Sequence, residues 1–203
     1  PIDMGMSFPF YGNTFTSVNV CSNGWISFTS TSTDLSNSAL PGTGSPENLL
    51  AAFHDDLRFS SAGAAAHTYF DGTRFIVQYT DVQKYFRNGS LTFQVILYPN
   101  GKIVYQYLTM SGADLTSATV GIQDGTRTIA SQMAYNETYI HDNLAIEIST
   151  TPDWLAVTPA NATIPTPSVR SAKRVTLVQA ESSVDHQLSP SAPPSNARTA
   201  MAC

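Results

Sequence analysis

The chain has 203 residues, of which 42% are hydrophobic and 12% charged, and its formal net charge is −5. The acidic balance excludes the basic surface of a nucleic-acid binder, and no apolar run reaches the length of about 18 residues that crosses a membrane. A surface that relies on Ser and Thr in place of charged groups favours a β-rich protein that works outside the cell.

Residues 1–150 consist of short alternating or apolar runs separated by turn residues, a pattern typical of strands. In chain order the predicted strands are 14–20, 25–28, 49–53, 73–82, a hairpin over 91–108, a second hairpin over 118–133, and 144–149. No window has a long period of 3.6 residues, so we predict an all-β fold, an antiparallel and jelly-roll-like β-sandwich.

The hairpin over residues 91–108 is the clearest unit. Asn100-Gly101 lies between its two strands and predicts a type I′ turn, which needs positive φ at both central positions. In its first strand every second residue is apolar, so one face should point into the core. That predicted core face consists of Leu91, Phe93, Val95 and Leu97.

The sequence changes in character after residue 150, which predicts a domain over 1–150 and a separate segment over 151–203. The segment has a Pro-rich linker, a predicted strand at 170–180 and a Ser/Pro/Ala-rich tail that we expect to be extended. Residues 1–150 carry 12 acidic against 6 basic side chains, whereas the segment carries 4 basic against 3 acidic ones. A basic cluster at 170–174 can therefore dock on an acidic body.

Two blocks give the chain a family resemblance, Phe8-Pro9-Phe10-Tyr11-Gly12 and Cys21-Ser22-Asn23-Gly24-Trp25-Ile26-Ser27-Phe28. They resemble the "FPFYG … SNGyisF" pattern of a secreted β-sandwich module found in bacterial surface and exported proteins. The pattern is similar to that of nidogen-like and plexin-domain-containing extracellular modules. The resemblance covers roughly residues 5–148 and implies an extracellular, non-catalytic accessory or adhesive role. Since no signal peptide is present and the sequence starts at Pro1, we treat it as a mature or trimmed product.

Both ends of the sandwich depart from this pattern. Family members usually have strand residues before the first block, and here only seven residues precede Phe8. The segment Trp154-Leu155-Ala156-Val157-Thr158-Pro159 resembles the start of an immunoglobulin-like bacterial repeat, which needs roughly 100 residues, more than follow it. The chain is therefore expected to lack sheet at its front and to carry a spare strand at its back.

This imbalance suggests a structural subunit of an extracellular filament, joined to copies of itself by β-strand addition. The expected donor is the strand at 170–180, in which Val175 and Leu177 fill pockets while Lys173 and Arg174 steer onto an acidic acceptor. Two alternatives stay open: the strand completes its own domain, or the chain is a fragment of a longer one.

The sequence contains no catalytic motif, and we expect no enzyme activity, cofactor or metal. The best constellation is His54-Asp55-Asp56, which could hold calcium or exchange protons. Neighbours along a strand point to opposite faces, so a structural role is favoured: capping a turn or pairing a nearby arginine.

A second function is a secreted or cell-surface adhesive module that binds glycans through exposed tyrosines. The candidates are Tyr98, Tyr105 and Tyr107 on the central hairpin, with Tyr79 and Tyr85 near the preceding strand. Cross-strand packing is the simpler interpretation of these rings. A third interpretation is an accessory domain cut from a larger hydrolase.

Modification sites complete the candidates. Three N-glycosylation triplets begin at Asn88, Asn136 and Asn161, the first two in predicted turns and the third in the Pro-rich linker. The two cysteines, Cys21 and Cys203, are too few for a disulfide scaffold. They either form one bond, within or between chains, or remain thiols, with Cys21 buried.

Overall fold

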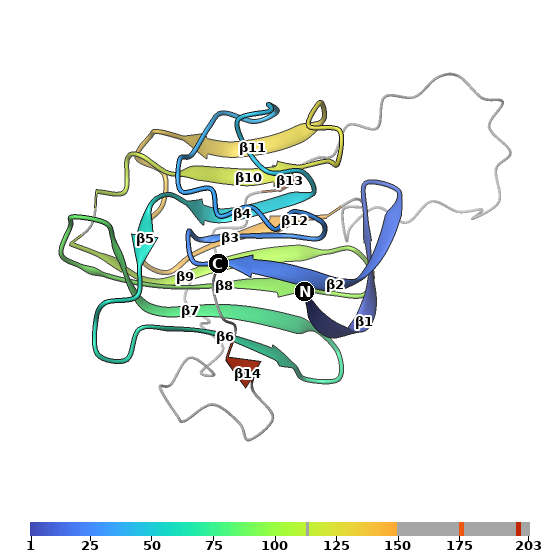
Figure 1. Ribbon diagram of the computed structural model, residues 1–203, viewed down its shortest axis with the longest axis horizontal. Helices are drawn as coiled ribbons and strands as arrows, with labels where there is room; N and C mark the ends of the chain where they lie inside the picture. The colour runs from blue at the N-terminus through green and yellow to red at the C-terminus, as the bar shows by residue number, and fades with distance from the viewer. Residues whose placement is uncertain (113, 150–174, 177–197, 200–203) are drawn as a thin grey trace, which may run out of the picture.

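The computed structural model describes residues 1–112, 114–149, 175–176 and 198–199. Two antiparallel sheets pack face to face and enclose one core, as predicted for a β-sandwich (Figure 1). Among the described residues there is no helix with the length and apolar character to cross a membrane.

The smaller sheet has the strand order β1-β2-β3-β4-β10-β11. Its strands are β1 (Ile2–Phe10), β2 (Asn13–Cys21), β3 (Trp25–Ser27), β4 (Leu49–His54), β10 (Thr119–Gln123) and β11 (Ala130–Tyr135). Strand β10 pairs antiparallel with β4, with Gly121 opposite Ala51. The chain therefore forms most of the larger sheet before it returns to add the last two strands of the smaller one.

The larger sheet has the order β13-β12-β9-β8-β7-β6-β14, and β5 pairs with β7 off this path. Its members are β5 (Leu57–Arg58), β6 (Ala65–Phe70), β7 (Phe75–Lys84), β8 (Ser90–Leu97), β9 (Ile103–Ser111), β12 (Leu144–Ile148), β13 (Val175–Thr176) and β14 (Arg198–Thr199). Five substantial strands are thus flanked at both edges by two-residue strands from the C-terminal segment.

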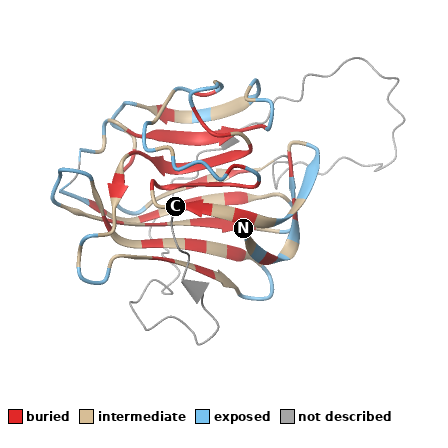
Figure 2. Cartoon of the chain, in the orientation of Figure 1, coloured by how far each residue is buried: buried red, intermediate tan, exposed pale blue. Residues whose placement is uncertain are grey.

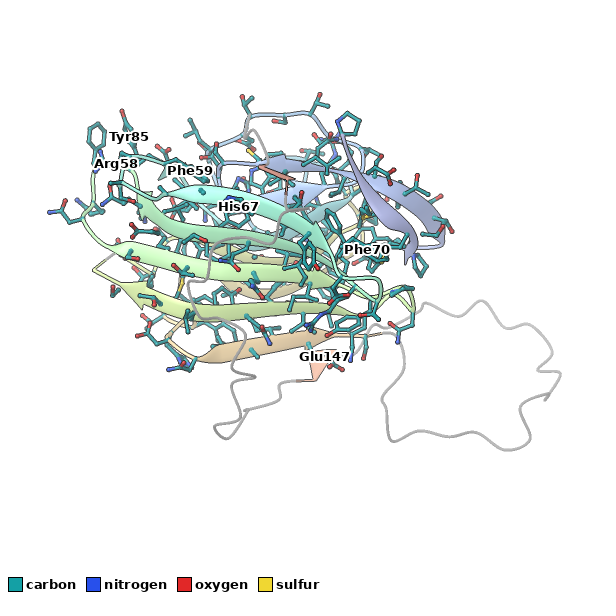
Figure 3. All side chains as sticks on the ribbon, turned by 90° about the horizontal axis from the view of Figure 1, so that it is seen from below. Arg58, Phe59, His67, Phe70, Tyr85 and Glu147 are labelled. Atoms are coloured by element: carbon teal, nitrogen blue, oxygen red, sulfur yellow. The ribbon has the colours of Figure 1, made fainter. Side chains whose placement is uncertain are left out.

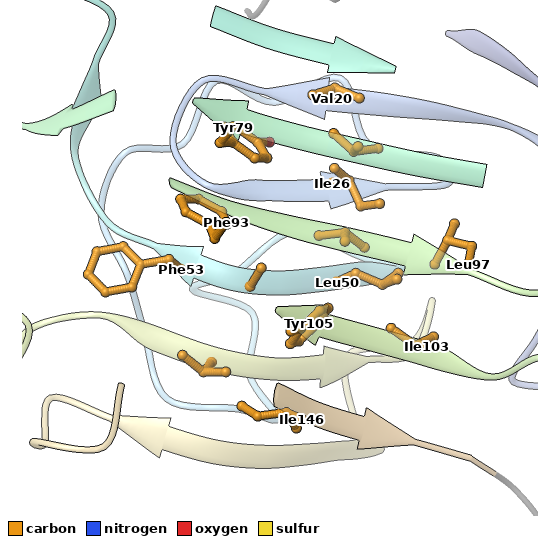
Figure 4. Close-up of a cluster of buried hydrophobic side chains, with 14 of the residues drawn as sticks. Val20, Ile26, Leu50, Phe53, Tyr79, Phe93, Leu97, Ile103, Tyr105 and Ile146 are labelled. Atoms are coloured by element: carbon orange, nitrogen blue, oxygen red, sulfur yellow. The ribbon is translucent and has the colours of Figure 1, made fainter. Parts of the chain in front are cut away.

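The core lies between the sheets, where the inward residues of both are buried (Figures 2 and 4). The predicted core face of β8 is confirmed, because all four of its residues are buried. The rings of Tyr79 and Phe93 stack with centroids 4.7 Å apart. Aromatic side chains bury about 150–250 Å² each, so such pairs contribute much of the stabilisation of the sandwich.

A second apolar cluster lies on the outward face of the smaller sheet. It contains Cys21, Trp25, Leu40, Leu49 and Ala51. Strand β4 is consequently buried on both faces, as its continuous apolar run predicts. The segment 29–48 covers this face, and side-chain amides of the sheet hold it: Gln123 and Gln132 accept hydrogen bonds from the backbone N–H groups of Gly42 and Leu40, each at 2.7 Å.

The turn of the central hairpin differs from the predicted type I′ turn. Gly101 has φ 86, while Asn100 does not have positive φ. The Gly101 N–H donates to the Tyr98 carbonyl at 2.9 Å, and the Tyr98 N–H donates to the Lys102 carbonyl at 2.9 Å. The preceding Pro99 has its φ fixed near about −65°, which favours an ordinary turn followed by one left-handed glycine.

The front of the sandwich also differs from the prediction. Residues 2–10 form a nine-residue edge strand, β1, which pairs with β2. Its buried residues Met4, Phe8 and Phe10 lie two or four positions apart, and the register shifts between Asp3 and Phe8. The smaller sheet therefore does not lack sheet at its front, and that part of the expected imbalance is wrong.

Candidate functional site

The outer edge of β12 is where the structure places the described part of the expected donor strand. Val175 pairs with Ile148 and Thr176 with Glu147, in the same chain. These two residues are therefore not spare, since they complete their own domain. Lys173, Arg174 and Leu177 lie outside the described residues.

The rest of this edge is open. Leu144, Ala145 and Ile146 pair with Tyr107, Gln106 and Tyr105 of β9 on their inner side. On their outer side no strand pairs with them within the part of the chain that the structure describes. An unpaired strand edge presents backbone N–H and C=O groups that can template a further strand.

The outer edge of β12 carries negative charge at Glu147, which is labelled in Figure 3. Its carboxylate lies 3.6 Å from the Lys102 ammonium, and both side chains are about one-quarter exposed. The same ammonium lies 4.6 Å from the centroid of the Tyr98 ring. An ion pair of this length and exposure is weak, so Glu147 can still attract a basic segment.

The opposite edge of the larger sheet is β6. Here Arg198 of β14 pairs with Thr68, and Thr199 pairs with His67. Both edges of the five-strand sheet can thus accept an added strand, and in the structure as described each pairs with two residues of the C-terminal segment.

The His54-Asp55-Asp56 constellation does not converge on one point. His54 is fully buried, with its ring centroid 5.9 Å from that of Trp25. Among the described residues, neither of its ring nitrogens has a hydrogen-bond partner of standard geometry. Burial lowers the pKa of His54, and the charges of Asp34 and Asp55 together with the Asp34 backbone act in the opposite direction.

Asp55 has a structural role, because its carboxylate joins separate segments of the chain. Its Oδ2 lies 2.9 Å from the Lys84 ammonium and accepts a hydrogen bond from the Ser117 hydroxyl at 2.7 Å. Lys84 also donates to Ser117 and, at 3.3 Å, to the Asp114 carbonyl. The partner is thus a lysine and not the expected arginine, and these contacts join the segment after β4 to the end of β7 and to the loop before β10.

Asp56 is less buried, and the pKa of its carboxyl is raised by desolvation and by the Asp55 charge, against the effect of Lys84. Across the described residues, no three His, Cys, Asp or Glu side chains are grouped so that they could hold a metal ion. A calcium site at this constellation has no support from the geometry.

The tyrosines proposed for glycan binding are mostly core residues. Tyr105 and Tyr107 are buried, and their hydroxyls donate to the carbonyls of Gly121 and Ala52 at 3.0 and 2.6 Å. Burial raises the pKa of both phenols well above the usual value. Tyr79 is likewise buried. These rings cannot stack on a sugar.

The exposed aromatic pair lies at one end of the sandwich instead, in the turn between β7 and β8. Tyr85 is 44% exposed and Phe86 77% exposed, with ring centroids 4.1 Å apart. The Arg58 guanidinium lies 6.0 Å from the Tyr85 ring centroid (Figure 3). Sequence reasoning missed Phe86, although adjacent aromatics before an Asn-Gly pair cannot both face the core.

The candidate modification sites differ in their surroundings. Asn88 and Asn136 are both exposed in turns, as predicted. The Asn136 side-chain oxygen accepts a hydrogen bond from the Asn37 amide at 2.8 Å. Cys21 is buried in the outer cluster, whereas Asn161 and Cys203 lie outside the described residues, so a Cys21–Cys203 bond stays a prediction.

Comparison with known families gives one match. A family described as NIDO related matches residues 1–166, which include both sheets apart from β13 and β14. No solved structure matches the chain.

Proposed function

The chain belongs to the NIDO-related family, and on that premise we propose that it is a non-catalytic structural subunit of an extracellular filament, joined to copies of itself by β-strand addition. The acceptor in this proposal is the outer edge of β12, and the donor is the segment around Val175 and Thr176 of a neighbouring copy.

The observation that carries the proposal is the partly filled edge of β12. The strand has five residues, of which two are paired on the outer side with residues that the structure describes. A longer strand from another chain can displace the two-residue one and pair with Leu144, Ala145 and Ile146 as well. Main-chain hydrogen bonds supply the affinity in such additions, and alternate side chains supply the specificity.

The register of the existing pair supports the expected pocket residues. Val175 lies opposite Ile148, and continuing the antiparallel register in an added strand would place Leu177 opposite Ile146. Both isoleucines are buried and belong to the core of the sandwich. Directly opposed residues share a face of the sheet, so the two apolar donor residues would meet the two core-facing residues of the acceptor.

Donation within the chain and donation between chains compete. A covalent connection raises the effective concentration of the donor at its own acceptor, to about millimolar for a short linker. Pairing between chains is favoured when it is longer than the pairing within the chain, because each further paired residue adds backbone hydrogen bonds. A donor and an acceptor at different places on one protomer form a heterologous contact, which propagates into a filament when the rotation between copies does not close a ring.

Charge favours the same pairing. The basic cluster at 170–174 belongs to a segment of net positive charge, and residues 1–150 are acidic. Opposite charge speeds encounter and weakens with added salt, so assembly should slow as the salt concentration rises.

The test is the size of the particles formed by the full chain over a range of protein concentrations, measured by light scattering and electron microscopy. We expect filaments from the full chain and none after deletion of residues 168–203. Ala145→Lys places a charge on the open edge and should also prevent filaments, whereas the matched change Gln94→Lys in the central strand β8 should permit them.

Filaments that persist in the deletion variant would overturn donation by this segment. A full chain that stays monomeric at every concentration would overturn assembly itself. The alternative of a glycan-binding module loses Tyr79, Tyr105 and Tyr107, which are buried, and keeps Tyr85 and Tyr98 as its candidates.

A further inference from the structure

The turn between β7 and β8 holds a bulky residue in an unusual backbone conformation. Phe86 has φ 55 and is 77% exposed. Positive φ at a bulky side chain is unfavourable by about 1 kcal/mol or more and persists where the surroundings impose it. The ring contacts the partly exposed Tyr85 ring, with centroids 4.1 Å apart, and folding leaves most of its surface in the solvent.

The same turn contains the glycosylation triplet Asn88-Gly89-Ser90, whose asparagine follows Phe86 by two residues. Asn88 is exposed, and its side-chain amide makes no hydrogen bond to any residue that the structure describes. The amide is therefore available for modification in the folded protein.

The backbone around Asn88 is held from both sides. The Arg87 N–H donates to the Lys84 carbonyl at 3.1 Å, and the Gln83 side-chain amide donates to the Gly89 carbonyl at 3.3 Å. Gly112 packs against the turn so closely that a Cβ there would lie 2.9 Å from the Gly89 Cα. The backbone of the turn that carries Phe86 and Asn88 is thus held by contacts on both sides of Asn88.

We propose that Asn88 carries an N-linked glycan and that Phe86 is the surface on which its first N-acetylhexosamine packs. One face of such a sugar ring is lined by C–H groups, which match the electron-rich face of an aromatic ring. Apolar burial of this exposed ring by the sugar then accounts for a phenylalanine that the fold itself does not bury.

The covalent step is transfer from a polyprenyl-diphosphate oligosaccharide, the donor used by secretory-pathway transferases. A bond forms between the Asn88 Nδ2 and C1 of the first sugar, and the bond from C1 to the diphosphate oxygen breaks. The polyprenyl diphosphate leaves with the electron pair of that bond, and one amide proton passes to the transferase base.

Asn136 provides an internal comparison within the same chain. Like Asn88 it is exposed, and unlike Asn88 it has positive φ, at 52. Its oxygen is engaged by Asn37, and the residue two positions before it is the buried Ala134. A glycan on Asn136 would have no aromatic ring at the corresponding position, so it should not stabilise the fold.

The test is to secrete the full chain from eukaryotic cells, map glycan occupancy by peptide mass spectrometry, and measure melting temperature before and after enzymatic removal of glycans. We expect Asn88 to be occupied and the glycan to raise the melting temperature by about 2–4 °C, the shift that one good contact gives a domain of this size. Phe86→Ala should abolish most of this shift, and Asn88→Gln should abolish it entirely. Asn136→Gln should leave it unchanged.

An unmodified Asn88 would overturn the proposal. So would a glycan on Asn88 whose removal leaves the melting temperature unchanged, or a shift that survives in Phe86→Ala. None of these outcomes bears on filament formation, which depends on the edge strand β12, and β9 separates β12 from the strands of this turn.

Discussion

The outward face of the smaller sheet and the outer edge of the larger one differ in how far the chain covers them. On the outward face, segment 29–48 lies over Trp25 and Ala51, and side-chain amides satisfy its backbone groups. At the outer edge of β12, the described part of the chain pairs with two residues and leaves three unpaired. The first region is closed by the chain's own side chains, and the second can still accept backbone from elsewhere.

The difference shows where this fold tolerates change. A buried polar group that loses its partner costs about 1–3 kcal/mol, whereas a solvent-exposed strand edge remains hydrogen-bonded to water. Substitutions in the covered region should therefore act on stability, and substitutions at the edge should act on association.

Trp25→Ala should have the largest effect. Trp25 is buried, and its ring N–H donates to the Asp34 carbonyl at 2.9 Å. Loss of the ring leaves a cavity and should lower the free energy of unfolding by about 3–5 kcal/mol, measured by urea denaturation. Trp25→Phe keeps most of the ring and should lose less than half as much. A Trp25→Ala loss below about 1 kcal/mol would show that segment 29–48 is not closed over a packed face.

Gln123→Ala should have the second-largest effect on stability. The amide of Gln123 accepts from the Gly42 N–H and donates to the Ser45 and Pro46 carbonyls at 3.4 and 3.0 Å. Its removal orphans these groups and should lower the free energy of unfolding by about 2–3 kcal/mol. The matched change Gln132→Ala removes the one bond to Leu40 and should cost about 1 kcal/mol. Equal losses in the two variants would contradict this account.

His54 should make the covered region sensitive to acid. Its pKa is lowered in the folded state by burial, so the unfolded chain binds the proton first as the pH falls. The stabilising contribution is present above the unfolded value of about 6.5 and is lost below it, with a slope of at most about 1.4 kcal/mol per pH unit.

The measurement is urea denaturation of the native chain and of His54→Leu between pH 7.5 and pH 5. We expect the slope with pH to be smaller in the variant. Asp71, Asp114 and Asp124 have lowered pKa values, so their contributions are lost at more acidic pH and do not obscure this window. Identical slopes in both chains would refute the role of His54.

Glu147→Gln, at the open edge, should have the smallest effect on stability. The ion pair with Lys102 is 3.6 Å long and partly exposed, so the free energy of unfolding should change by less than about 0.5 kcal/mol. Filament growth, followed by light scattering, should instead become slower and less dependent on salt. Unchanged salt dependence would exclude Glu147 as the charge that attracts the donor.

Strands with clean alternation could be predicted from the sequence. The apolar phase of β8 is enough to identify its core face, and the unbroken apolar run of β4 indicates burial on both faces. The same reasoning applied to β9 would have placed Tyr105 and Tyr107 in the core, because they share the phase of Ile103.

The remaining elements escape prediction for physical reasons. Gly5 and Pro9 interrupt the pattern of β1, and β5 has only two residues. The partners of Asp55 come from distant parts of the chain, at Lys84 and Ser117. Local periodicity carries no information about such contacts, so the structural role of Asp55 could not be distinguished from a metal site.

The pairing of β4 with β10 has a consequence for the order in which the protein folds. Ala51 and Gly121 pair although the whole of β5 to β9 lies between them in the sequence. In contrast, β6, β7, β8 and β9 form a meander in which each strand pairs with the next one in the sequence. Loop-closure entropy delays contacts between distant residues. The meander should therefore assemble early, with β10 and β11 joining last, and the rate-limiting step of folding should be the entry of β10 beside β4.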